Sequence, residues 1–199
     1  VIILFTLNIT FISRMTKNVF TNLSLKIFSM GYAIPGVVLA VGVITPITFM
    51  EKSFATLFDY KAESILTGTF TLLLIAYLVR FSTISIKTID SGFNQISKNY
   101  DLLSSSFGYS RIQTLYKIHI PILLPTISSA LILLFVDIVK ELPMTLILRP
   151  FNFLTLPVYL YELAEAENLS AIGLPGLILI IICLIPVIIL SKGITNNVK

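Results

Sequence analysis

Residues 100–125 read YDLLSSSFGYSRIQTLYKIHIPILLP and lie between two strongly apolar parts of the chain. Asp101 can cap a short helix, and Gly108 supplies a turn after it because glycine adopts positive φ at little cost. Ser110 can cap a second helix that runs toward Pro121, where an apolar run of membrane length begins. The stretch therefore predicts two helices joined at Gly108 and lying across a membrane face.

The composition of the whole chain favours the same environment. Of the 199 residues, 56% are hydrophobic and 12% are charged, whereas soluble domains carry about 25% charged residues. Several apolar runs approach the roughly 20 residues that a helix needs to span a bilayer. The alternating segments typical of outer-membrane barrel strands do not occur in the sequence. The sequence thus predicts an all-α integral membrane protein.

Five apolar segments are predicted to be membrane helices: residues 1–12, 31–50, 64–79, 120–139 and 172–190. The first is too short to span, so we interpret it as the end of a truncated helix. We expect residues 1–199 to be a single transmembrane domain, either a fragment or one half of a longer protein.

The segments between these helices differ in character. Residues 51–63 are predicted to form a polar loop. Residues 81–119 are predicted to form a second polar loop, which begins with an amphipathic helix extension at residues 82–96. Residues 142–160 hold three prolines and are predicted to form a loop folded back on the protein, with a sixth span as the alternative.

Basic residues indicate which side faces the cytoplasm. Segments 13–29, 80–119 and 191–199 hold ten of the 14 Lys and Arg residues, whereas segments 51–63 and 140–170 hold four. The five predicted helices place these two sets on opposite sides of the membrane. Because cytoplasmic loops carry the excess of Lys and Arg, we expect the stretch around Gly108 and the C-terminus to lie in the cytoplasm.

The spacing around Gly108 resembles the cytoplasmic EAA loop of ABC-transporter permeases, written EAA-x3-G-x9-I-x-L-P. The last four named places of that pattern are taken by Gly108, Ile118, Ile120 and Pro121. The triplet itself departs from the pattern, since Leu102, Leu103 and Ser104 stand there and Asp101 comes one residue early. The spacing of these residues thus matches the EAA loop, whereas the glutamate of the EAA triplet has no acidic counterpart at the same position.

A second resemblance covers nearly the whole chain from about residue 30. Segments 31–43 (GYAIPGVVLAVGV), 76–81 (AYLVRF) and 140–177 (KELPMTLILRPFNFLTLPVYLYELAEAENLSAIGLPGL) are similar to the C-terminal half of ferric-iron ABC-transporter permeases. This resemblance implies a multi-pass protein of the bacterial inner membrane that passes ferric iron delivered by a periplasmic binding protein. It also implies a second permease half, of the same or a different chain, and a separate ATPase subunit.

The resemblance implies that the loop holds a coupling helix seated in a groove of the ATPase subunit. Leu102, Leu103 and Phe107 would be its apolar contacts, and Arg111 and Lys117 its flanking charges. An ordinary cytoplasmic helix hairpin is the alternative. The candidate coupling residues are Asp101, Leu102, Leu103, Ser104, Phe107, Gly108, Arg111, Lys117, Ile118 and Pro121.

A second candidate set consists of Asp137, Lys140, Glu141 and Arg149, at an outer gate or a contact with the binding protein. The alternative is that these charges sit at the membrane interface and pair, Asp137 or Glu141 with Lys140. Residues 161–170 are interpreted as a solvated acidic face, and His119 as an interfacial histidine without a partner at ligand spacing. We therefore expect no metal site.

The sequence contains no GxxxxGK[ST] phosphate loop, so ATP hydrolysis is expected in a partner and the chain is not predicted to be an enzyme. We also expect no cofactor and no nucleic acid, with lipid as the surrounding medium. Three alternatives stay open: an importer permease for another solute (thiamine, sulfate, phosphonate or polyamine), an ion-coupled secondary transporter, and a decayed remnant. The second is disfavoured because spans 31–50, 64–79 and 172–190 hold no ionisable carboxylate or base.

Overall fold

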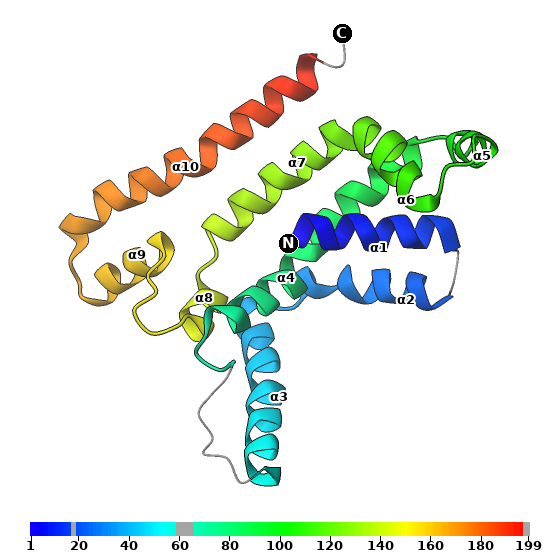
Figure 1. Ribbon diagram of the computed structural model, residues 1–199. Coiled ribbons are helices and arrows are strands. Elements are labelled where there is room, and N and C mark those ends of the chain that lie inside the picture. The colour runs from blue at the N-terminus through cyan, green and yellow to red at the C-terminus, as the bar shows by residue number, and fades with distance from the viewer. Residues whose placement is uncertain (17–18, 59–65, 197–199) are drawn as a thin grey trace. The chain divides into compact units, whose positions relative to one another are not determined.

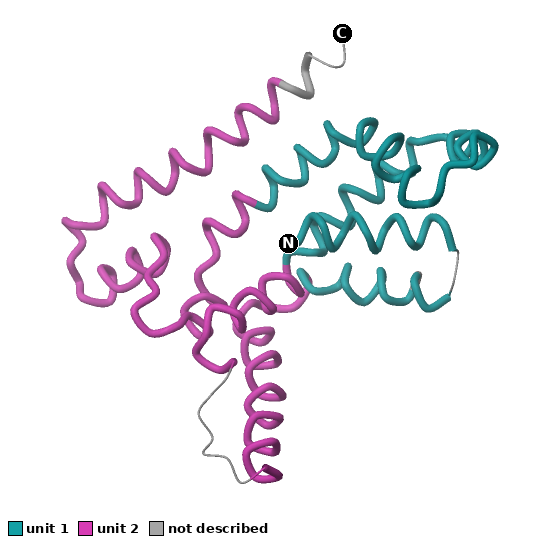
Figure 2. The backbone as a smooth tube through the Cα atoms, viewed as in Figure 1, with its two compact units in different colours: residues 1–32, 81–134 teal, residues 33–80, 135–199 magenta. Residues whose placement is uncertain are grey.

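The computed structural model describes residues 1–16, 19–58 and 66–196, and these residues form helices and turns without a strand. The chain divides into two compact units (Figure 2). Unit 1 comprises residues 1–32 and 81–134, and unit 2 comprises residues 33–80 and 135–199. Two long helices, α4 (Phe70–Gln95) and α7 (Ile120–Val139), each contribute residues to both units.

Four helical stretches of the described chain are long and apolar enough to cross a membrane: Gly36–Leu57, Phe70–Gln95, Arg111–Val139 and Leu169–Lys192. A shorter apolar helix, α1 (Ile2–Thr16), comes before them. The predicted all-α membrane protein with a short first helix is therefore confirmed. In the first and last of the four stretches, few or no residues are buried within the protein, which leaves their apolar side chains available to lipid.

Unit 1 begins with a helical hairpin, in which α1 packs against α2 (Val19–Phe28) (Figure 1). The rings of Phe5 and Phe28 meet edge to face with their centroids 5.0 Å apart. We predicted a loop over residues 13–29, and that prediction was wrong because both sides of this hairpin are helical. A 3₁₀ turn, η1 (Gly31–Ala33), follows α2.

The other elements of unit 1 are the second part of α4, α5 (Asn99–Ser106), α6 (Arg111–Thr114), a π-helical turn η2 (Leu115–His119) and most of α7. Their core is an apolar cluster drawn from α1, α4, η2 and α7, with Phe11 and Phe93 among its largest members. Gly92 allows the close approach of α4 to α7, because a Cβ there would lie only 2.8 Å from side-chain atoms of Leu123 and Thr126.

Unit 2 contains α3 (Gly36–Leu57), α8 (Pro143–Leu148), α9 (Leu156–Glu165) and α10 (Leu169–Asn196). In this unit α3 packs against α8, and α9 packs against α10. The predicted loop over residues 142–160 instead holds α8 and the start of α9, both too short to span a bilayer. Two of its prolines open these helices, where the missing amide is not needed.

The largest difference from the predicted boundaries concerns Arg80. We expected a span at 64–79, closed by Arg80, and an amphipathic helix extension at 82–96. Helix α4 runs without a break from Phe70 to Gln95, so the extension is present but Arg80 does not close the helix. Residues 59–65, which include the predicted start of that span, lie outside the described residues. The predicted span at 31–50 is also displaced, since α3 begins at Gly36 and continues to Leu57 with Pro46 inside it.

Candidate functional site

The turn between α5 and α6 closes α5 with two backbone hydrogen bonds. The amide of Gly108 donates to the carbonyl of Ser105, and that of Tyr109 donates to Ser104, both at 3.0 Å. Gly108 has a φ of +75°. This is the arrangement by which helices commonly end at a left-handed glycine. The predicted turn at Gly108 is confirmed.

The next helix begins with a reciprocal cap. The Gln113 amide donates to Ser110 Oγ at 3.3 Å, and the Ser110 amide donates to Gln113 Oε1 at 2.9 Å. This capping box satisfies two amides at the start of α6. The predicted cap at Ser110 is confirmed, and α5 and α6 are thus fixed at both sides of the turn.

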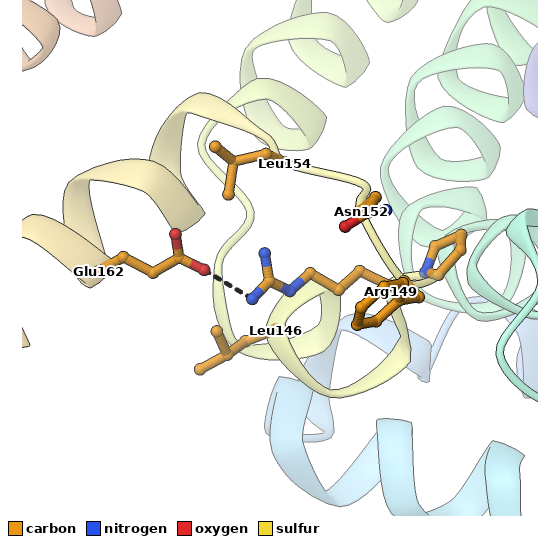
Figure 3. A pocket seen from close by; sticks show the side chains of 7 residues that line it. Leu146, Arg149, Asn152, Leu154 and Glu162 are labelled. Atoms are coloured by element: carbon orange, nitrogen blue, oxygen red, sulfur yellow. Dashed lines mark hydrogen bonds and ion pairs between the residues drawn. The ribbon is translucent and has the colours of Figure 1, made fainter.

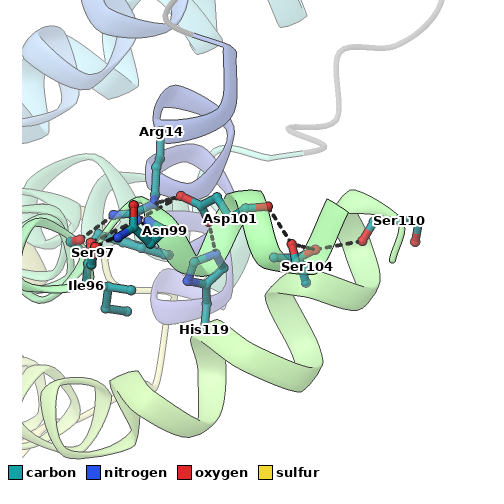
Figure 4. A network of polar contacts seen from close by, with 10 residues as sticks. Arg14, Ile96, Ser97, Asn99, Asp101, Ser104, Ser110 and His119 are labelled. Carbon is teal, nitrogen blue, oxygen red and sulfur yellow. Dashed lines mark hydrogen bonds and ion pairs between the residues drawn. The ribbon is translucent and has the colours of Figure 1, made fainter. Parts of the chain in front are cut away.

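Asp101 does not cap α5, and our prediction that it does was wrong. The N-cap position is held by Lys98, and Asp101 lies inside the first turn of the helix. Its carboxylate points toward Arg14 and His119 (Figure 4). It accepts from Arg14 Nε at 3.0 Å and pairs with Arg14 Nη2 at 2.9 Å, while its other oxygen lies 2.8 Å from His119 Nε2.

Arg14 extends this contact to the end of α4. Its guanidinium also donates to the carbonyl of Phe93 and, at 3.0 Å, to that of Ile96. Carbonyls at the end of a helix have few partners of their own, so a cation is favourable there. Arg14, Asp101 and His119 therefore connect α1, the end of α4, α5 and η2 within unit 1.

His119 is buried within unit 1. Its ring lies between Phe11 and Phe93, with centroid distances of 5.6 and 5.4 Å. A lone histidine in the sequence gave no sign of this environment, because its partners come from residues far away in the chain. A buried ring nitrogen favours a polar neighbour, and Asp101 Oδ1 lies 2.8 Å from His119 Nε2.

The π-helical turn η2 places the His119 side chain in the buried part of unit 1. The Ile120 amide donates to the carbonyl of Leu115, five residues back, which widens this turn relative to an α-helix. Lys117 in the same turn remains exposed, and its ammonium lies 4.9 Å from the centroid of the Tyr109 ring. That distance is suited to a cation–π contact.

The opposite side of α5 presents apolar side chains to the outside of unit 1. Leu102, Leu103 and Phe107 are 66%, 55% and 76% exposed. Ser104, between them in sequence, is buried, and its Oγ lies 3.0 Å from the hydroxyl of Thr114 on α6. Helix α5 therefore contacts α6 through a small polar residue, and Leu102, Leu103 and the C-cap residue Phe107 stay exposed in the described chain.

The charged residues predicted near an outer gate fall into separate contacts of unit 2. Lys140 pairs with Asp137 at 2.6 Å, as one of the two interfacial alternatives requires. Glu141 instead pairs with Arg80 at 3.5 Å and accepts from the Met144 amide at 3.1 Å, at the start of α8. The sequence did not reveal the pairing of Glu141 with Arg80, because about 60 positions separate the two residues.

Arg80 and Glu141 lie close to the first turn of α3. Arg80 Nη1 donates to the carbonyl of Ile34 at 2.8 Å. A Cβ on Gly36 would lie 3.1 Å from Glu141 Oε1 and 3.5 Å from Pro143 Cβ. This glycine therefore permits the close approach of α3 to the segment that leads into α8.

Arg149 lines a surface cleft of about 520 Å³ in unit 2 (Figure 3). Its guanidinium donates to Glu162 Oε1 at 2.7 Å and to the carbonyl of Phe153 at 3.3 Å. Glu165 also has a partner on the same helix. The Tyr161 hydroxyl donates a hydrogen bond to Glu165, and this bond raises the pKa of Tyr161. The acidic face predicted over residues 161–170 is thus partly paired.

A family model described as the binding-protein-dependent transport system inner membrane component matches residues 3–199. The chain belongs to this family. The family is one of transport permeases, and its members are components of the inner membrane.

Two relatives show how this permease compares with longer proteins. It is 25% identical over 161 residues to the Fe(3+)-transport system permease protein FbpB 2 of Haemophilus influenzae, covering 81% of the chain and 29% of the relative. It is 26% identical over 144 residues to the putative 2-aminoethylphosphonate transport system permease protein PhnV of Salmonella typhimurium, covering 72% of the chain and 50% of the relative. The chain spans half or less of each relative.

The structure brings some of the predicted site residues of this permease together and separates others. Residues 101–108 form one helix and its turn, and Arg111, Lys117, Ile118 and Pro121 follow on α6, η2 and α7. Sequence reasoning missed Arg14 and His119, the partners of Asp101. The sequence gave no signal for the Arg14 contact, because Arg14 lies 87 positions away from Asp101.

Proposed function

We propose that this chain is a permease subunit of an ATP-driven importer, and that α5 is the helix that couples it to a separate ATPase subunit. The observation that carries the proposal is the bent α5–α6 pair, which is capped on both sides of its turn and carries exposed apolar side chains. Family membership over residues 3–199 supports the same function.

The contacts within unit 1 suggest how coupling would work. A docked ATPase that changes shape would push on Leu103 and Phe107, and α5 would move as a body because Gly108 and Ser110 fix its end. Arg14, Asp101 and His119 would pass that movement to α1, α4 and η2. Helix α7 follows η2 directly, so the movement would reach a candidate membrane span.

We propose ferric iron, delivered by a periplasmic binding protein, as the substrate. The resemblance of segment 140–177 to ferric-iron permeases and the similarity to FbpB 2 over 81% of the chain support it. A 2-aminoethylphosphonate system is the second candidate, because the similarity to PhnV is equally high at 26% identity. Selectivity would lie largely with the binding protein.

The proposed orientation places α5 and the C-terminus in the cytoplasm. The structure moves Arg80 and Lys87 from a predicted loop into α4. Outside the four candidate spans, the segments on the proposed cytoplasmic side hold five Lys and Arg residues against three on the other side, which retains the positive-inside bias. On the outer side, Asp137, Lys140, Glu141 and Arg149 are proposed to contact the binding protein or a gate, and a second permease half would complete the pathway.

Uptake by cells that lack the chromosomal gene tests the function and the substrate together. We expect the restored gene to raise uptake of radiolabelled ferric iron and not of 2-aminoethylphosphonate, in the presence of the cognate binding protein. Uptake should persist when the proton gradient is collapsed and stop when ATP is depleted. Uptake that follows the ion gradient instead would identify a secondary transporter, and the reverse substrate preference would favour the phosphonate system.

A further inference from the structure

The acidic residue of the α5 loop is occupied inside the protein. Asp101 uses one carboxylate oxygen for Arg14 and places the other 2.8 Å from His119 (Figure 4). Arg14 and His119 are largely shielded from solvent, with 10% and 0% of their side chains exposed. Withdrawing the carboxylate to meet an outside partner would leave a shielded guanidinium without its anion, which is strongly unfavourable.

The uncovered side of α5 and α6 then has a simple composition. Its exposed apolar side chains include Leu102, Leu103 and Phe107, together with Ile112 on α6. The exposed charged residues around them are Lys98, Arg111 and Lys117, all of which are basic. Since Asp101 is the sole acidic residue from 91 to 136, no carboxylate of this segment offsets them.

From this arrangement we propose that the ATPase subunit receives α5 in a groove with an apolar floor and an acidic rim. The proposal rests on the importer function above and adds the chemistry of the partner. Asp101 makes no contact with the ATPase and acts as a positioning residue through Arg14 and His119. Acidic residues on the rim would attract the basic residues and speed encounter, and the apolar contacts would supply most of the affinity.

The proposed groove is tested by measuring how tightly the purified ATPase subunit binds the full-length permease in lipid nanodiscs, at low and at high salt. Replacing Leu103 and Phe107 together by Ser should weaken binding about tenfold or more at either salt concentration, as for residues at the centre of an interface. The double variant Arg111→Gln, Lys117→Gln should lose most of the salt dependence that the wild type shows. Lys26→Gln on α2 is the matched control, because Lys26 is exposed in the same unit and outside this surface.

A double-mutant cycle separates a positioning role from direct docking. Asp101→Asn and Arg14→Gln should each retain the wild-type salt dependence. In combination they should weaken binding no more than the stronger single variant, because both break the same internal contact. If Asp101 docked on the ATPase, its effect would persist undiminished beside Arg14→Gln and would flatten the salt dependence.

The outcomes also separate this proposal from the importer function. If the wild-type permease does not bind the ATPase at all, the proposed function fails. If the wild type binds and the effects of the Asp101 and Arg14 variants are additive, the positioning role of Asp101 is refuted. If the wild type binds more tightly at high salt, the acidic rim is refuted. In both cases the importer function stands.

Discussion

Gly108 offers a direct experiment on the turn that orients α5. A Cβ at this position would meet no atom within 4 Å, so a substitution there acts only through the backbone φ of +75°. This conformation costs a residue with a Cβ about 1–2 kcal/mol. Because affinity changes tenfold for about 1.4 kcal/mol, the corresponding loss of ATPase binding is about fivefold to thirtyfold if docking requires the native turn.

Three substitutions at Gly108 test whether the loss of binding arises from the backbone conformation. Asn tolerates positive φ best among the larger residues, Ala less well, and a β-branched residue worst. Binding to the ATPase should therefore fall in the order Gly108→Asn, Gly108→Ala, Gly108→Val. Gly173→Val is the matched control, because a Cβ at Gly173 also meets nothing within 4 Å and that position lies inside α10 without a positive φ.

Titration of the ATPase against each variant in nanodiscs gives the affinities, and hydrogen exchange at the Gly108 and Tyr109 amides reports the turn itself. Equal affinities across the three Gly108 variants would refute the reasoning. A loss at Gly173→Val as large as that at Gly108→Val would do the same, because it would show that volume rather than φ decides the effect.

Three further changes test other contacts. Gly92→Val forces a Cβ to within 2.8 Å of the facing α7 side chains and should lower the stability by about 1–3 kcal/mol in thermal unfolding; an unchanged melting temperature would contradict the tight packing of α4 on α7. Ser104→Leu should loosen α5 from α6 and speed trypsin cleavage of the loop, whereas Ser105→Leu, at an exposed position, should not. The exposed Arg149–Glu162 pair should show a coupling energy of about 0.2–1 kcal/mol in a thermal double-mutant cycle with Gln variants, decreasing in high salt; a much larger value would indicate a shielded pair.

Local signals accounted for the parts of the fold that were predicted correctly. Gly108 and Ser110 act on neighbours within a few residues, so their roles follow from residue type and position alone. The same holds for the apolar run that became α7, which ends at Val139 as hydropathy predicted. In each case the interaction that fixes the structure lies within one or two helical turns.

Long-range pairing accounted for most of the errors. Arg80 seemed to end a span because a lone cation in lipid is costly, but Glu141 neutralises it and α4 continues past it. We predicted Asp101 to be a helix cap, yet Arg14, 87 positions away, binds its carboxylate. The periodicity of a single sequence does not indicate which distant charged residues pair, so these ion pairs are identified only from the structure.

The π-helical turn at residues 115–119 has a consequence for how this stretch tolerates changes in length. Each residue of an α-helix rotates the following chain by about 100°. Losing one residue here could restore an ordinary helix without breaking it, yet it would swing His119 away from Asp101 and turn α7 relative to α6. Natural variants with a shortened turn should therefore carry a compensating change at position 14 or 101, and single-residue deletions in the laboratory should be folded but uncoupled.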